Sequence, residues 1–223
     1  MSENPIVLSG VRATGDPHLG NYLGAFKDFV EMDKDPDRDC MFFIANFHSL
    51  TTRPDPEEME ADLEEIVKCF LACGLDPNRS IIYAQSSIPE LGNLTWLLSN
   101  LAPVADLQGM PHWKEKKGSN SALVGANAGL LFYPVLMAAD ILGPRANLVP
   151  VGEDQKPHIE LTRDIAKRFN DQYGYLFPIP ATLDHDIRVR GLDGKGKMSK
   201  SSPDGCIFMT DDQQTVKQKV KRA

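Results

Sequence analysis

The chain has 223 residues and a mass of 24.7 kDa, and 42% of its residues are hydrophobic, which is enough for one well-packed core. It contains no apolar run long enough to span a bilayer, and no secretory signal precedes the first predicted strand, so we expect a cytoplasmic protein without a membrane partner. The net charge of −7 argues against a broad basic coat for nonspecific nucleic-acid binding, although a local basic surface that meets RNA is compatible with it.

Short apolar runs alternate along the chain with longer segments of helical periodicity. This order is typical of an α/β protein in which helices cover both faces of a parallel sheet. The predicted strands lie near 5–10, 40–46, 81–85 and 147–151. The predicted helices span about 18–32, 56–73, 90–101, 127–142 and 153–170.

The ends of several helices carry local signals. Asp55 and Pro56 open the second helix and Gly74 stops it. Pro134 is expected to kink or interrupt the helix at 127–142, because proline lacks a backbone N–H. Asp211 and Asp212 open a short basic helix near the end of the chain. The basic residues of this helix are equally well explained as a solvated face and as an RNA contact.

The four cysteines do not have the spacing of a disulfide framework or of a zinc site. Cys69 and Cys73 are one helical turn apart but lack a second pair of ligands. We therefore expect buried thiols at these positions, with no disulfide and no bound zinc. The remaining two cysteines are Cys40 and Cys206.

The segment His18-Leu19-Gly20-Asn21 follows the first strand and opens the first helix. A helix N-terminus attracts phosphate, because its free N–H groups and the helix dipole point toward the ligand. A chance match of four residues is common, and His18 is also suited to cap the helix. The segment predicts a nucleotide site only in combination with a second signal.

The second signal is Lys197-Met198-Ser199-Lys200-Ser201, in a glycine-rich loop near the other end of the chain. Two lysines three residues apart can stabilise the charge that grows on a polyphosphate leaving group. The alternative is a solvated basic loop. The order and separation of the two segments favour one shared ATP site.

These two segments resemble the signatures of class I aminoacyl-tRNA synthetases, and the middle of the chain narrows the resemblance to the tryptophanyl-tRNA synthetases. It does so in three stretches, Met137–Leu142, Val149–Gln155 and His158–Asp164, so that the resemblance covers nearly the whole chain. The tyrosine enzymes usually have a differently spaced Gly-Asp-Gln segment. The resemblance implies a Rossmann-like doubly wound parallel sheet and an ATP-dependent tryptophan–tRNA ligase. The implied partners are ATP with Mg²⁺, L-tryptophan, tRNA(Trp) and a second copy of the chain in a homodimer.

The resemblance also implies roles for individual residues. Catalytic roles fall to His18, Asn21, Lys197 and Lys200. ATP contacts fall to Arg12, Ala13, Thr14, Gly20, Asn21, Gly152, Glu153, Asp154, Val189, Lys197, Met198, Ser199, Lys200 and Ser201. Tryptophan contacts fall to Asp140, Met137, Gln155, Tyr133, His48, Gly10 and Val151, and no protein ligand is expected for a metal. From the residues alone, Asp154 is better explained as a helix cap, Tyr133 as core, and His48 and Gln155 as ordinary polar residues at element ends.

Asp140 is the side chain that says most about the substrate. It lies in an apolar helical segment, where an unpaired charge is expensive, so the carboxylate needs a hydrogen-bond donor. An internal donor such as Arg145 or a backbone N–H is the simpler explanation. By resemblance, the donor is instead the indole N–H of tryptophan, with Met137 packed on the ring. A phenyl ring cannot donate this hydrogen bond.

The chain departs from the family pattern at three positions of its first strand and loop. Arg12 and Ala13 stand where many members have Gln and Pro, and Leu8 stands where many have an aromatic residue. Family members also continue beyond the lysine loop into a helical domain. We therefore expect a catalytic domain at 1–205, with a mobile lysine loop at 184–202, and the start of a helical domain at 206–223.

Three alternatives remain at this point. A regulatory protein could keep the fold and bind tryptophan or nucleotide without charging tRNA, although intact His18, Asn21, Lys197 and Lys200 argue against it. A nucleotidyltransferase of the same superfamily would have no reason to keep Asp140 together with Gln155. A tyrosine-specific relative would be distinguished by which aromatic amino acid stabilises it against heat.

Overall fold

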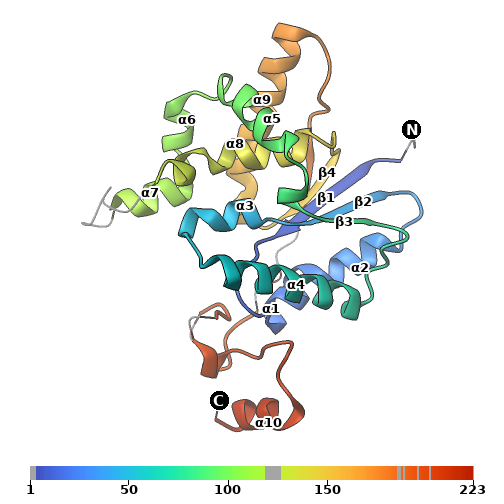
Figure 1. The fold of residues 1–223 in the computed structure, drawn as a ribbon, viewed down its shortest axis with the longest axis vertical. Helices are drawn as coiled ribbons and strands as arrows, with labels where there is room; N and C mark the ends of the chain where they lie inside the picture. Colours follow the sequence, from blue (N-terminus) through green and yellow to red (C-terminus); the bar gives the residue numbers. More distant parts are fainter. Residues whose placement is uncertain are drawn as a thin grey trace.

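The computed structural model describes residues 4–118, 127–184, 187, 189–194, 196–200 and 202–222, and only the backbone of 116–118 and Asp184. This part of the chain contains a five-stranded parallel sheet in the order β3-β2-β1-β4-β5 (Figure 1). The strands are β1 (Ile6–Val11), β2 (Asp39–Ile44), β3 (Ile81–Ala84), β4 (Leu148–Val151) and β5 (Ala181–Asp184). The strand order reverses between β1 and β4, which makes the sheet doubly wound and confirms the predicted Rossmann-like class.

Helices cover both faces of the sheet. In Figure 1, α2 and α4 lie below it, whereas α5, α8 and α9 lie above it. The helical part of the first crossover is continuous, with α1 (Leu19–Asn21), the π-helical turn η1 (Tyr22–Phe26) and α2 (Lys27–Asp33) in direct succession. The other α-helices are α3 (Asn46–Ser49), α4 (Pro56–Cys73), α5 (Glu90–Ser99), α6 (Val104–Gln108), α7 (Pro111–Gly118), α8 (Ala128–Leu142), α9 (Lys156–Tyr173) and α10 (Gln213–Arg222). Short 3-10 turns are η2 (Leu50–Thr52), η3 (Gln85–Ser87), η4 (Glu153–Gln155) and η5 (Pro203–Gly205).

Successive strand residues enter different hydrophobic clusters, because side chains alternate across a strand. Val7 and Phe42 belong to the cluster that α2 and α4 complete, whereas Leu8 and Phe43 belong to the cluster beneath α8 and α9. A third cluster joins α5, α6, α8 and α9. Both faces of the sheet are therefore buried, as an all-parallel sheet requires.

Helix α4 confirms the predicted boundaries. The Asp55 carboxylate accepts hydrogen bonds from the N–H groups of Glu57 and Glu58, at 2.9 and 3.4 Å. Pro56 occupies the first turn, and Gly74 ends the helix with φ of 101°, a left-handed conformation that suits glycine. The predicted basic helix is α10, where the Asp212 carboxylate accepts from the N–H of Thr215 at 2.6 Å.

The structure corrects some expectations about the elements. Helix α8 continues through Pro134, so the expected interruption is wrong, whereas the expected kink stays a prediction. Pro134 is buried, and the packing of the helix outweighs its missing hydrogen bond. Strand β5 and the short helices α3, α6 and α7 were not predicted. Strand β5 has four residues and follows Pro178 and Pro180, so it carries no clear alternation, and its existence depends on pairing with β4.

All four cysteines are free thiols. Cys40, Cys69 and Cys206 are buried, as expected, whereas Cys73 is half-buried. Burial raises the pKa of the thiols of Cys40 and Cys69 to about 11. These thiols are therefore protonated and unreactive at neutral pH.

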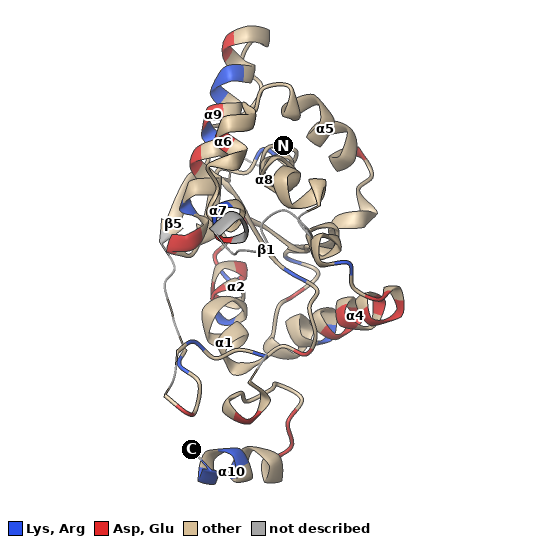
Figure 2. Cartoon of the chain, turned by 90° about the vertical axis from the view of Figure 1, so that its left-hand side faces the viewer, with Lys and Arg blue, Asp and Glu red and all other residues tan. Residues whose placement is uncertain are grey.

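Charge is distributed unevenly over the helices (Figure 2). Acidic residues follow one another along α4, while α10 ends in basic residues.

Within the described part of the chain, no helix combines the length and the apolar character needed to cross a membrane. The predicted domain boundary after residue 205 stays a prediction, and the buried Cys206 lies directly beyond it.

Phe70 anchors α4 to the sheet layer. Its fully buried ring lies edge-on against Phe26 and Phe29, with centroid separations of 5.1 and 5.9 Å. We predict that Phe70→Ala lowers the free energy of unfolding by about 3–5 kcal/mol, because it leaves a cavity between two helices. Chemical denaturation measures this loss. Leu71→Ala on the same helix, at a side chain that is 47% exposed, should change it by less than about 1 kcal/mol, and equal losses would contradict the anchoring role.

Candidate active site

A cavity of about 470 Å³ lies at the carboxyl ends of the strands, beside the point where the strand order reverses. Ligands of doubly wound sheets bind at this position. The end of β1 contributes Gly10, the end of β2 is followed by Ala45, and the end of β4 contributes Val151 and Gly152. Eight of the predicted residues besides Gly10 line it: Arg12, His48, Tyr133, Met137, Asp140, Val151, Gly152 and Gln155.

Gly10 allows the backbone of β1 to approach its neighbour at the cavity wall. A Cβ atom placed on Gly10 would lie 2.5 Å from the ring of Phe43, well inside van der Waals contact. The Phe43 ring cannot move aside easily, because it stacks on Tyr83 with a centroid separation of 5.6 Å. Any other residue at this position would therefore push the wall of the cavity apart.

Asp140 is the buried charged group of the cavity and is only 1% exposed. His48 Nε2 donates to its Oδ2 at 2.9 Å, and Gln85 Nε2 donates to Oδ1 and Oδ2 at 2.8 and 2.9 Å. The simpler explanation, a donor within the chain, is confirmed, although the donors are His48 and Gln85 rather than the suggested Arg145 or a backbone N–H. The carboxylate is held by side chains from α3 and η3, which are separated from it by 92 and 55 positions.

Burial raises the pKa of Asp140 above its ordinary range, and the hydrogen bonds from His48 and Gln85 counteract this rise. The pKa of Tyr83, on β3, is also raised, first by burial and then by the negative charge of Asp140. The carboxylate is thus costly to ionise and depends on its donors. A ligand that supplies a further N–H donor would stabilise the charged form.

Tyr133, on α8, is held by two histidines. Its hydroxyl lies 2.6 Å from His158 Nε2 on α9 and 2.9 Å from His112 Nδ1 on α7. His158 is fully buried, and burial lowers its pKa to about 4, so it is neutral at physiological pH. Its Nδ1 makes no hydrogen bond of good geometry with the described residues. The nearby backbone of Gln155 raises the pKa of His158, but the effect of burial is larger. Tyr133 is thereby fixed at the cavity wall.

His18 confirms the capping role that the sequence left open. Its Nδ1 accepts from the N–H of Asn21 at 3.3 Å, and Asn21 Oδ1 accepts from the N–H of His18 at 3.0 Å. Burial lowers the pKa of His18, and the nearby charges of Lys200 and Lys197 lower it further. A neutral imidazole keeps the lone pair that the cap needs. The cap and a nucleotide-facing role are compatible, because only one ring nitrogen is used.

The structure brings the lysine segment beside the His18 segment. Met198 is buried and its Cβ lies 3.8 Å from the position of a Cβ on Gly20. Lys200 Nζ donates to the carbonyl oxygens of Thr14 and Gly15, at 2.7 Å for Gly15. Gly15 adopts φ of 62°, which turns the loop so that both carbonyls face the lysine.

Residues 189–191 pair with residues 196–198 in a narrow hairpin, which contains the start of the lysine segment. The N–H of Met198 donates to the carbonyl of Val189 at 2.8 Å, and Arg190 pairs with Lys197 across the hairpin. The side chain of Lys197 is exposed, and so is that of Ser199. Ser201 lies outside the described residues, as does part of the predicted 184–202 loop.

Three of the predicted ATP contacts have other surroundings than expected. Ala13 is buried in the core, so only its backbone can face a ligand, and its carbonyl already accepts from Ser49 Oγ at 2.8 Å. Glu153 pairs with Lys156 at 2.6 Å. Asp154 does not cap α9, contrary to the sequence-based interpretation, because its carboxylate accepts from the side chain of Gln155 at 2.7 Å.

The comparisons with known proteins agree with this geometry. The family model of class I tRNA synthetases of the W and Y type matches residues 1–223. The chain belongs to this family. The resemblance inferred from the motifs is thereby confirmed.

Individual relatives of this synthetase family show how much of a longer chain is matched. The chain is 44% identical over 227 residues to the tryptophan–tRNA ligase of Chlamydia caviae, which matches 100% of this chain and 66% of the ligase. It is 48% identical over 197 residues to that of Fusobacterium nucleatum, with 87% of this chain and 59% of the ligase covered. A crystal structure of Campylobacter jejuni tryptophanyl-tRNA synthetase, complexed with ADP and tryptophan, has a TM-score of 0.87 at 36% identity and covers 97% of this chain and 66% of its own. The chain thus spans less than two thirds of the length of these relatives.

The sequence did not indicate several residues of the cavity and its surroundings. Gln85 directly follows strand β3, and a polar residue at the carboxyl end of a predicted strand was a usable signal. His158 lies in one of the stretches that resemble the family, but its residue type and position did not indicate a role at the cavity. His112 lies on α7, which was not predicted, so nothing in the sequence linked it to the cavity.

The buried His158 should make folding stability depend on pH. Its pKa of about 4 in the folded chain lies below the ordinary 6.5, so the unfolded chain binds a proton first as the pH falls. We predict that about 3 kcal/mol of stability, present above pH 6.5, is lost as the pH falls toward 4, and that His158→Gln removes this part of the slope. Denaturant titrations at several pH values measure it, and parallel curves for the two proteins would refute the assignment.

Proposed function

We propose that this chain carries the amino-acid-activating centre of a tryptophan–tRNA ligase. The observation that supports this most is the buried carboxylate of Asp140 in an otherwise largely apolar cavity at the carboxyl edge of the sheet. Such a group suits a ligand with an aromatic body and one N–H donor, which describes the indole of tryptophan. The related structure from Campylobacter jejuni, complexed with ADP and tryptophan, supports the same choice of ligand.

Substrate contacts follow from the cavity lining. Met137 is proposed to pack on the indole ring, while Asp140 accepts its N–H. Tyr133 and Gln155 are proposed to receive the ammonium group, and His48 forms the wall between the ring and the strand ends. A ligand without the N–H would leave the buried carboxylate one donor short, which is the physical basis of selectivity.

The proposed reaction joins this pocket to the ATP signatures. A carboxylate oxygen of tryptophan attacks the α-phosphorus of ATP, the bond from that phosphorus to the bridging oxygen breaks, and pyrophosphate leaves with the bond electrons. The products are tryptophanyl-adenylate and pyrophosphate. Because the carboxylate is already a nucleophile, the chain contributes mainly position and charge stabilisation.

The neutral His18 and Asn21, at the start of α1, are proposed to face the phosphates and adenosine, together with the backbone of Gly20. Lys197 and Lys200 are proposed to stabilise pyrophosphate as its charge develops, and Arg12 is proposed as a further cation at the cavity. Gly152 lets a backbone approach the ribose closely, beside Asp154.

Mg²⁺ is proposed to accompany ATP. No group of three acidic, histidine or cysteine side chains within the described residues is arranged as a metal site, so the phosphate oxygens and water are left to supply most of the ligands. The ion neutralises phosphate charge when it is bound. The residues of this chain do not need to form a cage for it.

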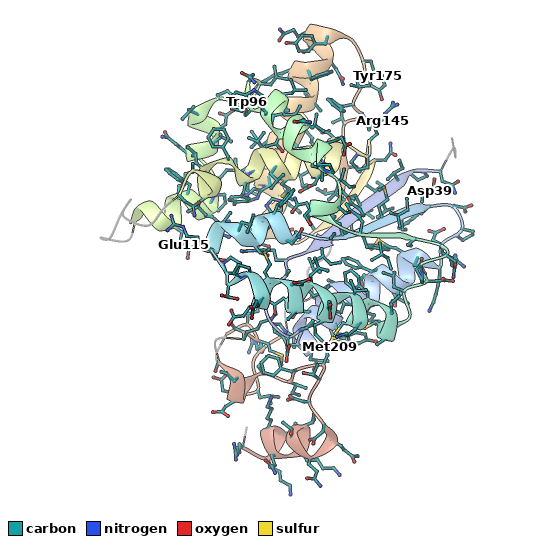
Figure 3. All side chains as sticks on the ribbon, viewed as in Figure 1. Asp39, Trp96, Glu115, Arg145, Tyr175 and Met209 are labelled. Carbon is teal, nitrogen blue, oxygen red and sulfur yellow. The ribbon has the colours of Figure 1, made fainter. Side chains whose placement is uncertain are left out.

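The second step, transfer of tryptophan to a hydroxyl at the end of tRNA(Trp), and assembly as a homodimer are further proposals. The apolar residues in the described parts of 90–142 are divided between the core and the surface. Leu98, Leu107 and Val135 are buried, whereas Trp96, Leu97 and Val104 are exposed by 71%, 61% and 58%. Trp96 lies at the outside of α5 in Figure 3 and is available to a second copy.

Exchange of labelled pyrophosphate into ATP tests the proposed reaction. We expect exchange that depends on tryptophan and not on tyrosine. Exchange with tyrosine alone would show that the chain activates tyrosine instead of tryptophan. Failure with both amino acids, combined with no rise in melting temperature on adding tryptophan, would overturn the proposed function of this chain.

The role of Lys200 can be separated from substrate binding. We predict that Lys200→Ala lowers the rate of adenylate formation by about a hundredfold, because a charge on the leaving group loses its partner, while tryptophan affinity stays within about twofold. Rapid-quench kinetics and equilibrium tryptophan binding measure the two quantities. Lys217→Ala, at an exposed position on α10, is the matched control. Equal losses of rate and affinity at Lys200 would contradict the role.

A further inference from the structure

Gln85 holds two parts of the site at once. It is fully buried and follows directly after β3. Its Oε1 accepts from the N–H groups of Phe47 and His48, at 3.0 and 3.4 Å, while its Nε2 donates to both oxygens of Asp140. All hydrogen-bonding atoms of the amide are therefore engaged, and each side faces a different segment of the chain.

The two sides of the amide fix its orientation. If the amide were flipped, Oε1 would face the carboxylate oxygens of Asp140 and the NH₂ group would face two backbone donors. Both contacts would be repulsive. The N–H groups at the start of α3 thus force the NH₂ group toward Asp140, and they set the direction of the carboxylate through this one side chain.

The hydrogen bonds leave Asp140 with room for one more donor. A carboxylate has about four acceptor positions, two on each oxygen. Oδ2 accepts from Gln85 and from His48, whereas Gln85 is the one donor to Oδ1 among the residues that the structure describes. Oδ1 therefore keeps one acceptor position, and Asp140 lines the cavity.

We propose that Gln85 is a specificity-determining positioning residue, which orients the Asp140 carboxylate so that Oδ1 accepts the ring N–H of the bound amino acid. This inference rests on the proposed function. Gln85 is neutral, so it stabilises the buried charge without cancelling it, and the acceptor strength of the carboxylate is retained. Without Gln85, Asp140 keeps His48 as its donor and is no longer held in a fixed direction.

A pair of ligands that differ only in the ring donor tests the inference. Tryptophan and the analogue in which sulfur replaces the indole N–H, 3-(benzothiophen-3-yl)alanine, are titrated into the whole chain by calorimetry without ATP. In Gln85→Met, which keeps the length but not the hydrogen bonds, the preference for tryptophan over the analogue should fall about tenfold or more. Gln108→Met, at an exposed position on α6, is the matched control and should leave the ratio unchanged.

Gln85→Glu separates positioning from structural support. A glutamate can still accept from the N–H of Phe47, but it places a second carboxyl group against Asp140, and the pair then shares a proton at a raised pKa. The protonated form can donate to Asp140 as the amide does. The preference for tryptophan should therefore recover in this variant as the pH is lowered. His48 on α3 and Tyr83 on β3 also face Asp140, but both are present in wild type, so the difference between the two proteins isolates position 85.

The outcomes distinguish the inference from its premise. A lowered preference in Gln85→Met together with acid recovery in Gln85→Glu supports the assignment. An unchanged preference, or equal losses for both ligands in a folded variant, overturns the role of Gln85 while leaving the proposed function intact. If Gln85→Met does not fold, an acid-independent preference in Gln85→Glu overturns it in the same way. A wild-type chain that binds neither ligand overturns the proposed function and the inference with it.

Discussion

Burying one carboxylate at the floor of a mainly apolar cavity is the constraint around which this site is built. Asp140 loses its hydration and must be compensated by donors that the chain brings from elsewhere. Those donors are His48, after β2, and Gln85, after β3. Because parallel strands all end at the same edge of the sheet, the two segments arrive beside α8 without any long connection. The strand topology thus supplies the donors that stabilise the buried charge.

The same edge explains how the His18 segment and the lysine segment meet. The loop after β1 leads directly into α1, and its carbonyls at Thr14 and Gly15 receive the ammonium group of Lys200. The segment after the lysines continues the contact, since the N–H of Leu19 donates to the carbonyl of Ile207 and the N–H of Met209 donates to the carbonyl of Pro17, both at 2.9 Å. The first and last parts of the chain are therefore joined beneath the sheet, where Figure 1 shows α1 close to the segment that leads to α10.

Two further side chains show how neighbouring helices hold a residue of the cavity wall in place. Tyr133 is held by His158 from α9 and by His112 from α7. Burial keeps His158 neutral, so the tyrosine hydroxyl faces no positive charge from this partner. This part of the cavity wall is consequently set by three successive α-helices, α7, α8 and α9. A rigid wall of this kind is what a site that selects by one hydrogen bond requires.

The amino-acid sequence by itself determined the parallel α/β class, most of the long elements and both signatures, since apolar periodicity, capping residues such as Asp55 and short motifs are local properties. It also marked Asp140 as a charge in need of a donor. Only the tertiary structure decided which residues donate to it. Gln85 and His48, rather than Arg145, lie beside Asp140 because of which strands are neighbours in the sheet. No local sequence pattern records which strands are neighbours. Strand β5 was decided in the same way, since four residues without alternation become a strand only when β4 offers them a backbone to pair with.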